Sequence, residues 1–349
     1  MATIIAQPRI LIIYTGGTIG MIENPETKVL KPFDFSHLID NVPKIKMLDY
    51  HIDNLQFEPP IDSSNMNPSH WSNIANAVEK NYDDYDGFVI LHGTDTMAYT
   101  ASALSFMLEN LDKPVIITGS QLPIGEVRTD GEENLITALQ VAAATDDRGG
   151  AMVREVAILF ENHLIRGNRS SKVSADNFNA FMSNNYPDLA HIGLDISFNE
   201  DVLYRTVHSR PLMVHNHMDP NVMIIVLHPG MTRETLEYLL HTPGVKGVVL
   251  KTYGAGNSPS NEWFTQPIID AINRGVVILN VTQCGNGSVN SNLYDTGNTL
   301  AKAGVISGHD ITTEAAITKM MYLFGMNLPR NQVEKYLQHS ICGEMTEKN

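Results

Sequence analysis

The chain has 349 residues, of which 43% are hydrophobic and 18% are charged, so it is a folded globular protein and not a disordered one. This length favours two domains over one. The formal net charge of −15 argues against nucleic acid or an anionic membrane surface as the main partner. Cys284 and Cys342 are the only cysteines, which excludes a disulfide scaffold and a cysteine-rich zinc site.

Short apolar segments in the first half of the chain predict buried strands of a parallel sheet, at 9–14, 87–92, 113–119 and 155–160. Apolar residues at helical spacing predict helices between them, over 68–80, 95–110 and 130–145. Asn67 and Pro68 have the residue types expected at the start of the first of these helices. The repetition of strand, loop and helix is typical of an α/β layered sheet.

A second series of strands (222–227, 245–251, 275–283) and helices (near 232–240, 261–273, 313–325 and 330–339) predicts a second α/β unit. Between the two series, residues 195–221 are irregular and polar. We therefore expect two layered α/β domains. The larger is an N-terminal, flavodoxin-like catalytic domain over 1–200, and the smaller is a C-terminal domain over 222–349, with a linker over 201–221. We see neither a targeting signal nor a membrane span, and expect a cytoplasmic protein.

The first predicted strand is followed by "TGGTIG" (15–20), a loop that lets a small molecule come close to the backbone. It is not a P-loop, because no lysine follows Gly20 at the required spacing. It also fails the dinucleotide fingerprint, since its first two glycines are adjacent and the residues after it look like a loop. Taken alone, the segment can be read as a glycine turn capped by Thr18.

Similar residue types follow the other predicted strands: "HGTDTM" (92–97), "GSQLP" (119–123) and "ENHLIRGNRSSK" (161–172). Ligands bind beyond the carboxyl ends of the strands in an open α/β sheet. Glycine, hydroxyl and acidic residues at four such ends therefore predict one shared site. His92 we interpret as a packing residue at a strand end rather than as the catalytic base.

The order of these motifs, together with "DSSNM" (62–66), "YGAGN" (253–257) and "TQC" (282–284), resembles the bacterial L-asparaginase family, most closely its cytoplasmic type I branch. The resemblance covers most of the chain. It implies hydrolysis of the side-chain amide of L-asparagine to L-aspartate and ammonia, with no cofactor and no metal. The histidines of "HSRPLMVHNHMD" (208–219) fit a solvated connector better than a metal site.

Amide hydrolysis needs a nucleophile, a proton relay, an oxyanion site and a grip on the amino-acid end. Thr18 follows two glycines, and Thr94 follows a strand end with Asp95 beside it. Lys172, if buried among apolar groups near Thr94, would have a lowered pKa and accept its proton. The residues do not decide which threonine attacks first. By resemblance, Thr18 forms the acyl-enzyme, and Thr94, Asp95 and Lys172 form the supporting relay.

The resemblance also assigns residues to substrate binding. Asp95 is expected to bind the substrate ammonium. The α-amino acid end is expected to be bound by Asp62, Ser63 and Ser64, and Gly17 is expected to lie against the substrate. The alternative for 62–65 is a turn and cap cluster before the next helix, and both readings can hold together. Asn257 belongs to a segment that, in related enzymes, reaches the active site of a neighbouring subunit. We therefore expect a homo-oligomer. It should be at least a dimer, and we expect the full assembly to be a dimer of dimers.

The chain departs from the family pattern in three places. The lid after the glycine loop, 21–32, has no tyrosine; Thr27 and Lys28 stand near its expected position. Asn65 replaces an acid of the "SxDM" motif. At the regulatory asparagine pocket of type I enzymes, expected at Ser171, Lys251 and Cys284, a lysine replaces the arginine. Lys251 keeps the charge but loses the planar two-point grip on a carboxylate.

Two other functions remain open from the sequence. One is the related amidotransferase subunit that releases ammonia for tRNA-linked synthesis, although only eight residues precede the first predicted strand here and that subunit carries an extra N-terminal domain. The other is a catalytically silent amino-acid sensor on the same scaffold, which would be expected to lack the nucleophile. L-asparagine and L-glutamine differ by one methylene, worth about 1–3 kcal/mol, so the sequence does not decide their ratio.

Overall fold

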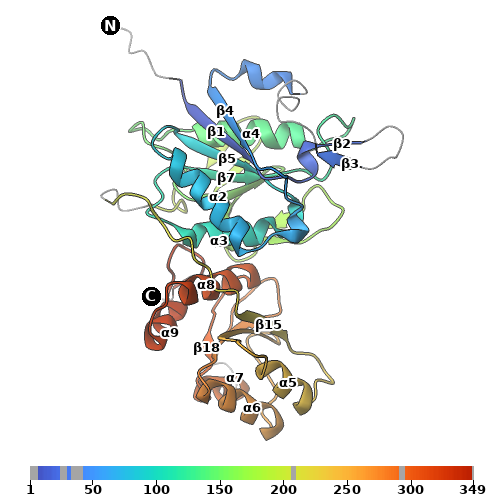
Figure 1. The fold of residues 1–349 in the computed structure, drawn as a ribbon, viewed down its shortest axis with the longest axis vertical. Helices are drawn as coiled ribbons and strands as arrows, with labels where there is room; N and C mark the ends of the chain where they lie inside the picture. Colours follow the sequence, from blue (N-terminus) through green and yellow to red (C-terminus); the bar gives the residue numbers. More distant parts are fainter. Residues whose placement is uncertain (1–6, 24–29, 33–41, 206–209, 291–294, 348–349) are drawn as a thin grey trace. The chain divides into compact units, whose positions relative to one another are not determined.

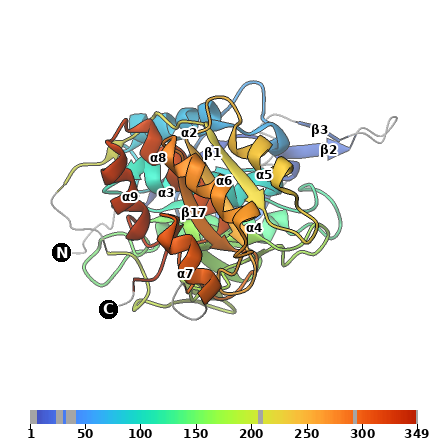
Figure 2. The same cartoon turned by 90° about the horizontal axis from the view of Figure 1, so that it is seen from below.

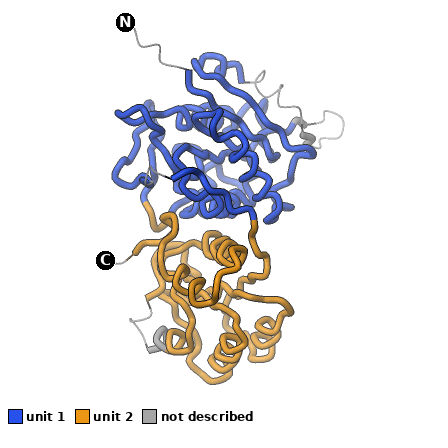
Figure 3. Tube along the Cα trace, turned by 60° about the vertical axis from the view of Figure 1, so that its left-hand side comes forward, with its two compact units in different colours: residues 1–183, 187–216 blue, residues 184–186, 217–349 orange. Residues whose placement is uncertain are grey.

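The computed structural model describes residues 7–23, 30–32, 42–205, 210–290 and 295–347. The chain forms two compact units (Figure 3). Unit 1 comprises Met1–Ser183 and Pro187–Asn216, and unit 2 comprises Asn184–Tyr186 and His217–Asn349. The division after Asn216 falls inside the segment expected to be a linker. Nothing in the sequence predicted that Asn184–Tyr186 belong to unit 2.

Unit 1 is built, within the described residues, on an eight-stranded sheet with the order β13-β12-β9-β8-β7-β5-β1-β4 (Figure 1). The parallel part runs from β4 to β8, and β9, β12 and β13 add antiparallel pairs at one edge. The bounds are β1 Arg9–Tyr14, β4 His51–Gln56, β5 Gly87–Leu91, β7 Val115–Thr118, β8 Val156–Phe160, β9 His163–Arg166, β12 Ala190–Ile192 and β13 Ile196–Phe198.

The four strands predicted in this half are confirmed as β1, β5, β7 and β8. β5, β7 and β8 are buried along their whole length and β1 is buried after Arg9, as expected for central parallel strands covered on both faces. The flanking strands were not predicted. β4 ("HIDNLQ") has no buried residue, because it lies at the sheet edge next to β1.

Helices cover both faces of this sheet. Figure 1 shows α4 (Gly131–Ala143) on one face, with α2 (Pro68–Asn81) and α3 (Met97–Met107) on the other. The predicted start of α2 is confirmed: the Asn67 side chain accepts hydrogen bonds from the backbone N–H groups of Ser69 and His70. Pro68 occupies the first helical position, where it forfeits no helical hydrogen bond.

Unit 2 contains a parallel sheet with the order β15-β16-β17-β18. Figure 2 shows α5 beside α6 in this unit, and α8 packs against α9. The predicted strands and helices after residue 220 are confirmed. The bounds are β15 Val222–Val226, β16 Gly247–Thr252, β17 Val277–Thr282, β18 Ile306–Ser307, α5 Arg233–Leu240, α6 Glu262–Asn273, α7 Asp295–Lys302, α8 Thr313–Gly325 and α9 Arg330–Gln338.

The expectation of two layered α/β domains is therefore confirmed at the level of fold class. The expected irregular stretch is less irregular than predicted, since it holds β13 and the short β14 (Met213–Val214), which pairs with β6 (Leu108–Glu109). Among the described residues, no helix has the length and apolarity needed to cross a bilayer.

Candidate active site

The strand order of unit 1 reverses at β1. The chain runs from β1 to β4 on one side and then to β5 on the other, so the carboxyl ends of β1 and β5 adjoin at a topological switch point. Such a point leaves a crevice in which α/β proteins bind ligands. Thr18 opens a 3₁₀ turn (Thr18–Gly20) after β1, and Thr94 opens another (Thr94–Thr96) after β5. The two threonine motifs therefore meet at this crevice.

Glycines allow the loops at this point to approach one another closely. Gly17 has φ 97°, and a Cβ there would overlap the backbone of Gly93. A Cβ on Gly93 would in turn overlap the Ser63 side chain, and one on Gly16 would overlap the backbone of Ile61. Any larger residue would separate the loops. The glycines thus bring the Thr18, Thr94 and Asp62–Ser64 segments together. The sequence predicted this for the Thr18 and Thr94 loops from their positions after strands, and for Asp62–Ser64 only from the family resemblance.

Thr94, Asp95 and Lys172 are in direct contact. Lys172 Nζ donates hydrogen bonds to Thr94 Oγ1 at 2.9 Å and to Asp95 Oδ1 at 2.8 Å. The Lys172 side chain is 19% exposed and that of Asp95 is 66% exposed, so the lysine is covered while the carboxylate faces solvent. Lys172 was expected to lie among apolar groups, but the contacts that hold its ammonium are a hydroxyl and a carboxylate.

Lys172 reaches Thr94 by a route that the sequence did not predict. Residues 161–172 are not a simple loop after β8, because β9 turns back antiparallel to it. The chain then returns as β10 (Ser171–Lys172), which pairs with β11 (Phe181–Met182). The centroid of the Phe181 ring lies 5.0 Å from that of the Phe160 ring, at the carboxyl end of β8. The pairing of Lys172 with Phe181 therefore brings Lys172 back to the carboxyl edge of the sheet.

Gln121 is a site residue that the sequence analysis missed. Thr94 Oγ1 donates to Gln121 Oε1 at 3.5 Å, and Gln121 Nε2 donates to the carbonyl of Asn177 at 2.9 Å. Because Lys172 already donates to Thr94, the Thr94 hydroxyl hydrogen must go to another acceptor, and Gln121 provides it. The signal was present in "GSQLP", which follows β7, but no role followed from the letters alone.

The Asp62–Ser64 segment forms the turn that was considered for it, and substrate binding by this segment stays a prediction. Asp62 accepts a hydrogen bond from the backbone of Ser64 at 2.9 Å, which is a turn of the expected kind. The backbone of Ser63 is bonded to the Thr94 loop, because Thr96 Oγ1 donates to the Ser63 carbonyl at 2.7 Å. Ser63 is buried, whereas Asp62 and Ser64 are exposed. The turn therefore leaves the side chains of Asp62 and Ser64 open to a ligand.

His92 is buried behind the Thr94 loop. Its Nδ1 lies 2.6 Å from the carbonyl of Gly93, which can only accept, so Nδ1 carries the hydrogen. Nε2 then accepts from the Thr100 hydroxyl at 2.9 Å, and Thr100 accepts from Trp71 Nε1 at 3.0 Å. Burial lowers the pKa of His92 from 6.5 to about 4. His92 is thus a neutral packing group, in agreement with our interpretation.

Tyr14 fixes the turn that carries Thr18. Its hydroxyl donates to the Gly20 carbonyl at 3.0 Å, and a Cβ on Gly20 would overlap the Tyr14 ring and hydroxyl. Burial raises the pKa of Tyr14 to about 12. A tyrosine with this pKa and a committed hydroxyl is not suited to take the proton of Thr18. Thr27 and Lys28, which stand near the missing lid tyrosine, lie outside the described residues.

The remaining candidates are divided between the units. Ser171 is in β10 of unit 1, while Lys251 is the last residue but one of β16 and Cys284 follows β17 in unit 2. In unit 2, Gln283 Nε2 donates to the Lys251 carbonyl at 3.0 Å and so ties these two strand ends together. Asn257 closes a turn with Tyr253, and its backbone N–H donates to the Tyr253 carbonyl at 2.7 Å. In the described part of the chain, no group of three His, Cys, Asp or Glu residues could hold a metal ion.

Comparison with known families matches both units. Residues 9–204 match the family "Asparaginase, N-terminal", and residues 221–337 match "Glutaminase/Asparaginase C-terminal domain". L-asparaginase 1 of Escherichia coli (strain K12) is 43% identical over 347 residues, which covers 97% of this chain and 98% of the relative. The 60 kDa lysophospholipase of Mus musculus is 40% identical over 364 residues, covering 97% of this chain and 63% of the relative.

Solved structures give the same result. L-asparaginase I from Vibrio cholerae superposes with a TM-score of 0.89 at 42% identity, covering 98% of this chain and all of that one. A protein from Campylobacter jejuni, described as a probable cytoplasmic L-asparaginase, superposes with a TM-score of 0.78 at 25% identity, covering 95% of this chain and 99% of that chain.

Proposed function

Because the chain belongs to the asparaginase family, we propose that it hydrolyses the side-chain amide of L-asparagine to L-aspartate and ammonia. The observation that carries this proposal is the contact of Lys172 with both Thr94 and Asp95, at the crevice where the loop of Thr18 packs on the loop of Thr94. A hydroxyl and a second hydroxyl paired with a lysine can supply the nucleophile and the proton relay that amide hydrolysis needs, and an exposed carboxylate can bind the substrate ammonium.

In the proposed reaction, Thr18 Oγ1 attacks the side-chain carbonyl carbon of asparagine. The C–N bond breaks, ammonia leaves with the hydroxyl proton, and an acyl-enzyme on Thr18 remains. Water then attacks this ester, releasing aspartate and returning the proton to Thr18. The backbone N–H groups of the glycine loop are candidates for stabilising the negative charge that develops on the carbonyl oxygen.

Thr94, Asp95 and Lys172 serve as the relay that activates the hydroxyl or the water. For Lys172 to accept a proton it must first give one up, and the Asp95 carboxylate, 2.8 Å away, is within reach of that proton. The exposed part of Asp95 is the proposed partner of the substrate ammonium. Asp62, Ser63 and Ser64 are proposed to bind the rest of the α-amino acid end, with Gly17 against the substrate.

The substrate preference is tested by purifying the protein alone and measuring ammonia release from L-asparagine and L-glutamine. Steady turnover of asparagine without a partner protein or tRNA supports the proposal. Ammonia release only in the presence of a second subunit would identify an amidotransferase, and binding without turnover would identify a sensor. The full-length match to an L-asparaginase and the retained Thr18 and Thr94 weigh against both alternatives.

Three finer features belong to the same proposal. A homo-oligomer, with Asn257 contributed to a neighbouring subunit's site, would cover groups that a single chain leaves exposed, such as Asp62 and Asp95. A cytoplasmic location is supported by the description of the Campylobacter jejuni homologue. A regulatory asparagine pocket at Ser171, Lys251 and Cys284 is supported by the sequence resemblance, with a weaker carboxylate grip at Lys251.

A further inference from the structure

Two buried polar residues at the start of α4 lie directly behind Gln121. The Asp130 carboxylate accepts the backbone N–H of Gln121 at 2.9 and 3.1 Å, and that of Leu122 at 3.1 Å. Asp130 is the residue before α4, yet its side chain does not cap the helix. The carboxylate is instead committed to the loop after β7, although a capping bond would have stabilised its own helix.

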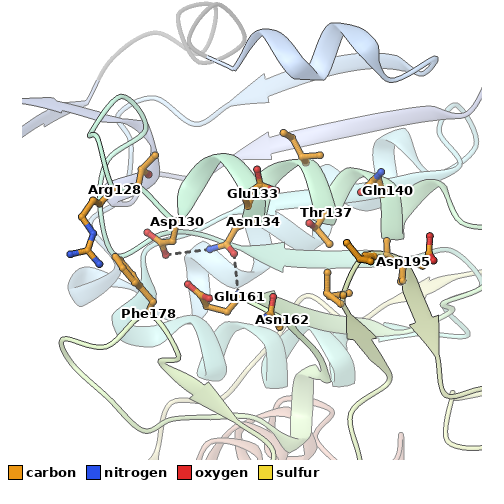
Figure 4. A pocket seen from close by; sticks show the side chains of 16 residues that line it. Arg128, Asp130, Glu133, Asn134, Thr137, Gln140, Glu161, Asn162, Phe178 and Asp195 are labelled. Atoms are coloured by element: carbon orange, nitrogen blue, oxygen red, sulfur yellow. Dashed lines mark hydrogen bonds between the residues drawn. The ribbon is translucent and has the colours of Figure 1, made fainter.

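Asn134 uses each of its hydrogen-bonding groups to hold this arrangement. Its Nδ2 donates to the Gly119 carbonyl at 3.0 Å and to Asp130 Oδ2 at 3.3 Å, and its Oδ1 accepts the backbone N–H of Glu161 at 3.0 Å. Figure 4 shows the Asp130–Asn134–Glu161 line of contacts along a pocket of about 860 Å³. Asn134 therefore joins the loop after β7 to the turn between β8 and β9, and it fixes the orientation of the Asp130 carboxylate.

We infer that Asp130, oriented by Asn134, is a positioning residue that fixes Gln121 and through it the hydroxyl hydrogen of Thr94. The chain of contacts is continuous: Asp130 holds the Gln121 backbone, and Gln121 Oε1 accepts from Thr94 Oγ1 at 3.5 Å, which itself accepts from Lys172. The consequence for turnover rests on the proposed function. Without Asp130, the Thr94 hydroxyl keeps its bond from Lys172 but loses the acceptor that directs its own hydrogen.

The test is a double-mutant cycle on kcat with Asp130→Asn and Gln121→Leu. Asp130→Asn keeps the shape of the side chain, removes its negative charge and replaces one of the two carboxylate oxygens that accept the N–H groups of Gln121 and Leu122. We expect it to lower kcat for asparagine roughly ten-fold or more while KM changes by less than about three-fold. In the Gln121→Leu background, the same substitution should change kcat by less than about two-fold, because the group through which it acts is absent.

A matched control is Asp146→Asn. The Asp146 carboxylate also accepts two backbone N–H groups in unit 1, from Arg148 at 2.9 Å and Gly150 at 3.0 Å, and it is 16% exposed. We expect this variant to lower the unfolding midpoint without lowering kcat. If Asp130→Asn reduces kcat by the same factor with and without Gln121, Asp130 only stabilises the fold and the inference is overturned.

Two further measurements keep the inference testable. If Asp130→Asn does not fold, Thr129→Val removes the hydrogen bond that the Thr129 hydroxyl donates to the Leu122 carbonyl, together with the one that it accepts from the Gly131 N–H. This variant should show the same coupling to Gln121, on a smaller scale. Hydrogen exchange at the amides of Gln121 and Leu122 needs no activity: it should accelerate in Asp130→Asn and not in Asp146→Asn. An inactive wild-type protein would defeat the proposed function alone, whereas unchanged exchange in Asp130→Asn would defeat the positioning role.

Discussion

The Thr94 hydroxyl has two neighbours, one that donates a hydrogen bond to it and one that accepts a hydrogen bond from it. Lys172 donates to its oxygen, and Gln121 accepts its hydrogen, so the hydroxyl lies between a cation and an amide oxygen. Thr18 lies on the adjoining loop, in a turn that Tyr14 fixes from behind. Each threonine is thus held by contacts that do not involve the other, while the glycines between them hold the loops together.

If Thr18 and Thr94 act as a unit, removing either should nearly abolish turnover. We expect Thr18→Ala and Thr94→Val each to lower kcat by about three orders of magnitude, and the double variant to be little worse, because groups that act in one reaction step are not additive. Ammonia release under saturating asparagine measures this. Substantial activity in Thr18→Ala would remove it from the nucleophile role, and additive losses would separate the two residues.

His92 predicts a stability effect at acidic pH. Burial lowers its pKa from 6.5 to about 4, so between these values the unfolded chain binds a proton that the folded chain does not. The stability contributed by neutral His92 is therefore complete above pH 6.5 and is lost as the pH falls toward 4, by up to about 3 kcal/mol. His92→Gln should lose correspondingly less stability over this range than the wild type.

The measurement uses denaturant unfolding followed by Trp71 fluorescence at several pH values. Trp263→Phe in all variants leaves Trp71 as the reporter, and Trp71 donates to the Thr100 that bonds His92. His191→Gln, at an exposed position in β12, controls for the loss of a histidine away from the Thr94 loop. Equal slopes for wild type and His92→Gln would show that His92 does not titrate as described.

The proposed catalytic residues could be named from the sequence because the motif order carries a family resemblance. Thr18, Thr94, Asp95 and Lys172 were all candidates. Gln121 was not, because its role depends on a tertiary contact that no local pattern encodes. The same holds for Asp130, whose position before a helix predicts a cap while its carboxylate bonds a different loop.

At the scale of elements, hydrophobic patterning predicted what lies inside the sheet and missed its margins. The central strands are continuous apolar runs because helices cover both of their faces. β4 and β9 lack that signal, as β4 is exposed along an edge and β9 follows β8 by a two-residue turn. The error mattered for Lys172, since the route through β9 and β10 determines how it reaches Thr94.

The lid expected over 21–32 leads to a prediction at the scale of elements. Its described ends form a two-stranded ribbon, β2 (Met21–Glu23) and β3 (Leu30–Pro32), paired from Met21 and Pro32 to Glu23 and Leu30. Replacing 24–29 by an Asn-Gly turn would close this ribbon in its shortest form. Because we expect the lid to contribute closure more than proton transfer, this deletion should lower kcat at least about ten-fold.

The single variants Thr27→Ala and Lys28→Ala should keep most of the turnover rate, and a polar replacement of 24–29 at equal length should behave as they do. These three variants separate the length of the lid from its chemistry. If either point variant loses turnover while folding and asparagine binding persist, that side chain has taken the chemical role of the missing tyrosine, and the lid is more than a cover.

At the scale of the whole molecule, the sequence predicted two α/β units because two strand–helix series are separated by a polar stretch. It could not predict that Asn184–Tyr186 belong to unit 2. Their signal is a set of tertiary contacts: the Asn185 side chain donates to the carbonyls of Gly287 and Asp310 and accepts the Gly287 N–H. The chain therefore enters unit 2 briefly at Asn184–Tyr186 and returns to unit 1 before unit 1 ends at Asn216.

We expect the active species to be at least a dimer, with Asn257 of one chain serving the site that contains Thr18 of another. Activity per chain should then fall on dilution in step with dissociation measured by sedimentation. A monomer with full activity at matched dilution would contradict this expectation.

Mixing two inactive variants tests the arrangement more directly. Thr18→Ala and Asn257→Ala should each be nearly inactive alone, yet a refolded equal mixture should recover about a quarter of wild-type activity. Half of randomly paired dimers are mixed, and each mixed dimer has one site with both native residues. If Asn257 instead acts on the Thr18 of its own chain, no pairing restores a native site and the mixture stays inactive. Recovery therefore distinguishes a site shared between chains from one completed within a single chain, which dilution alone cannot do.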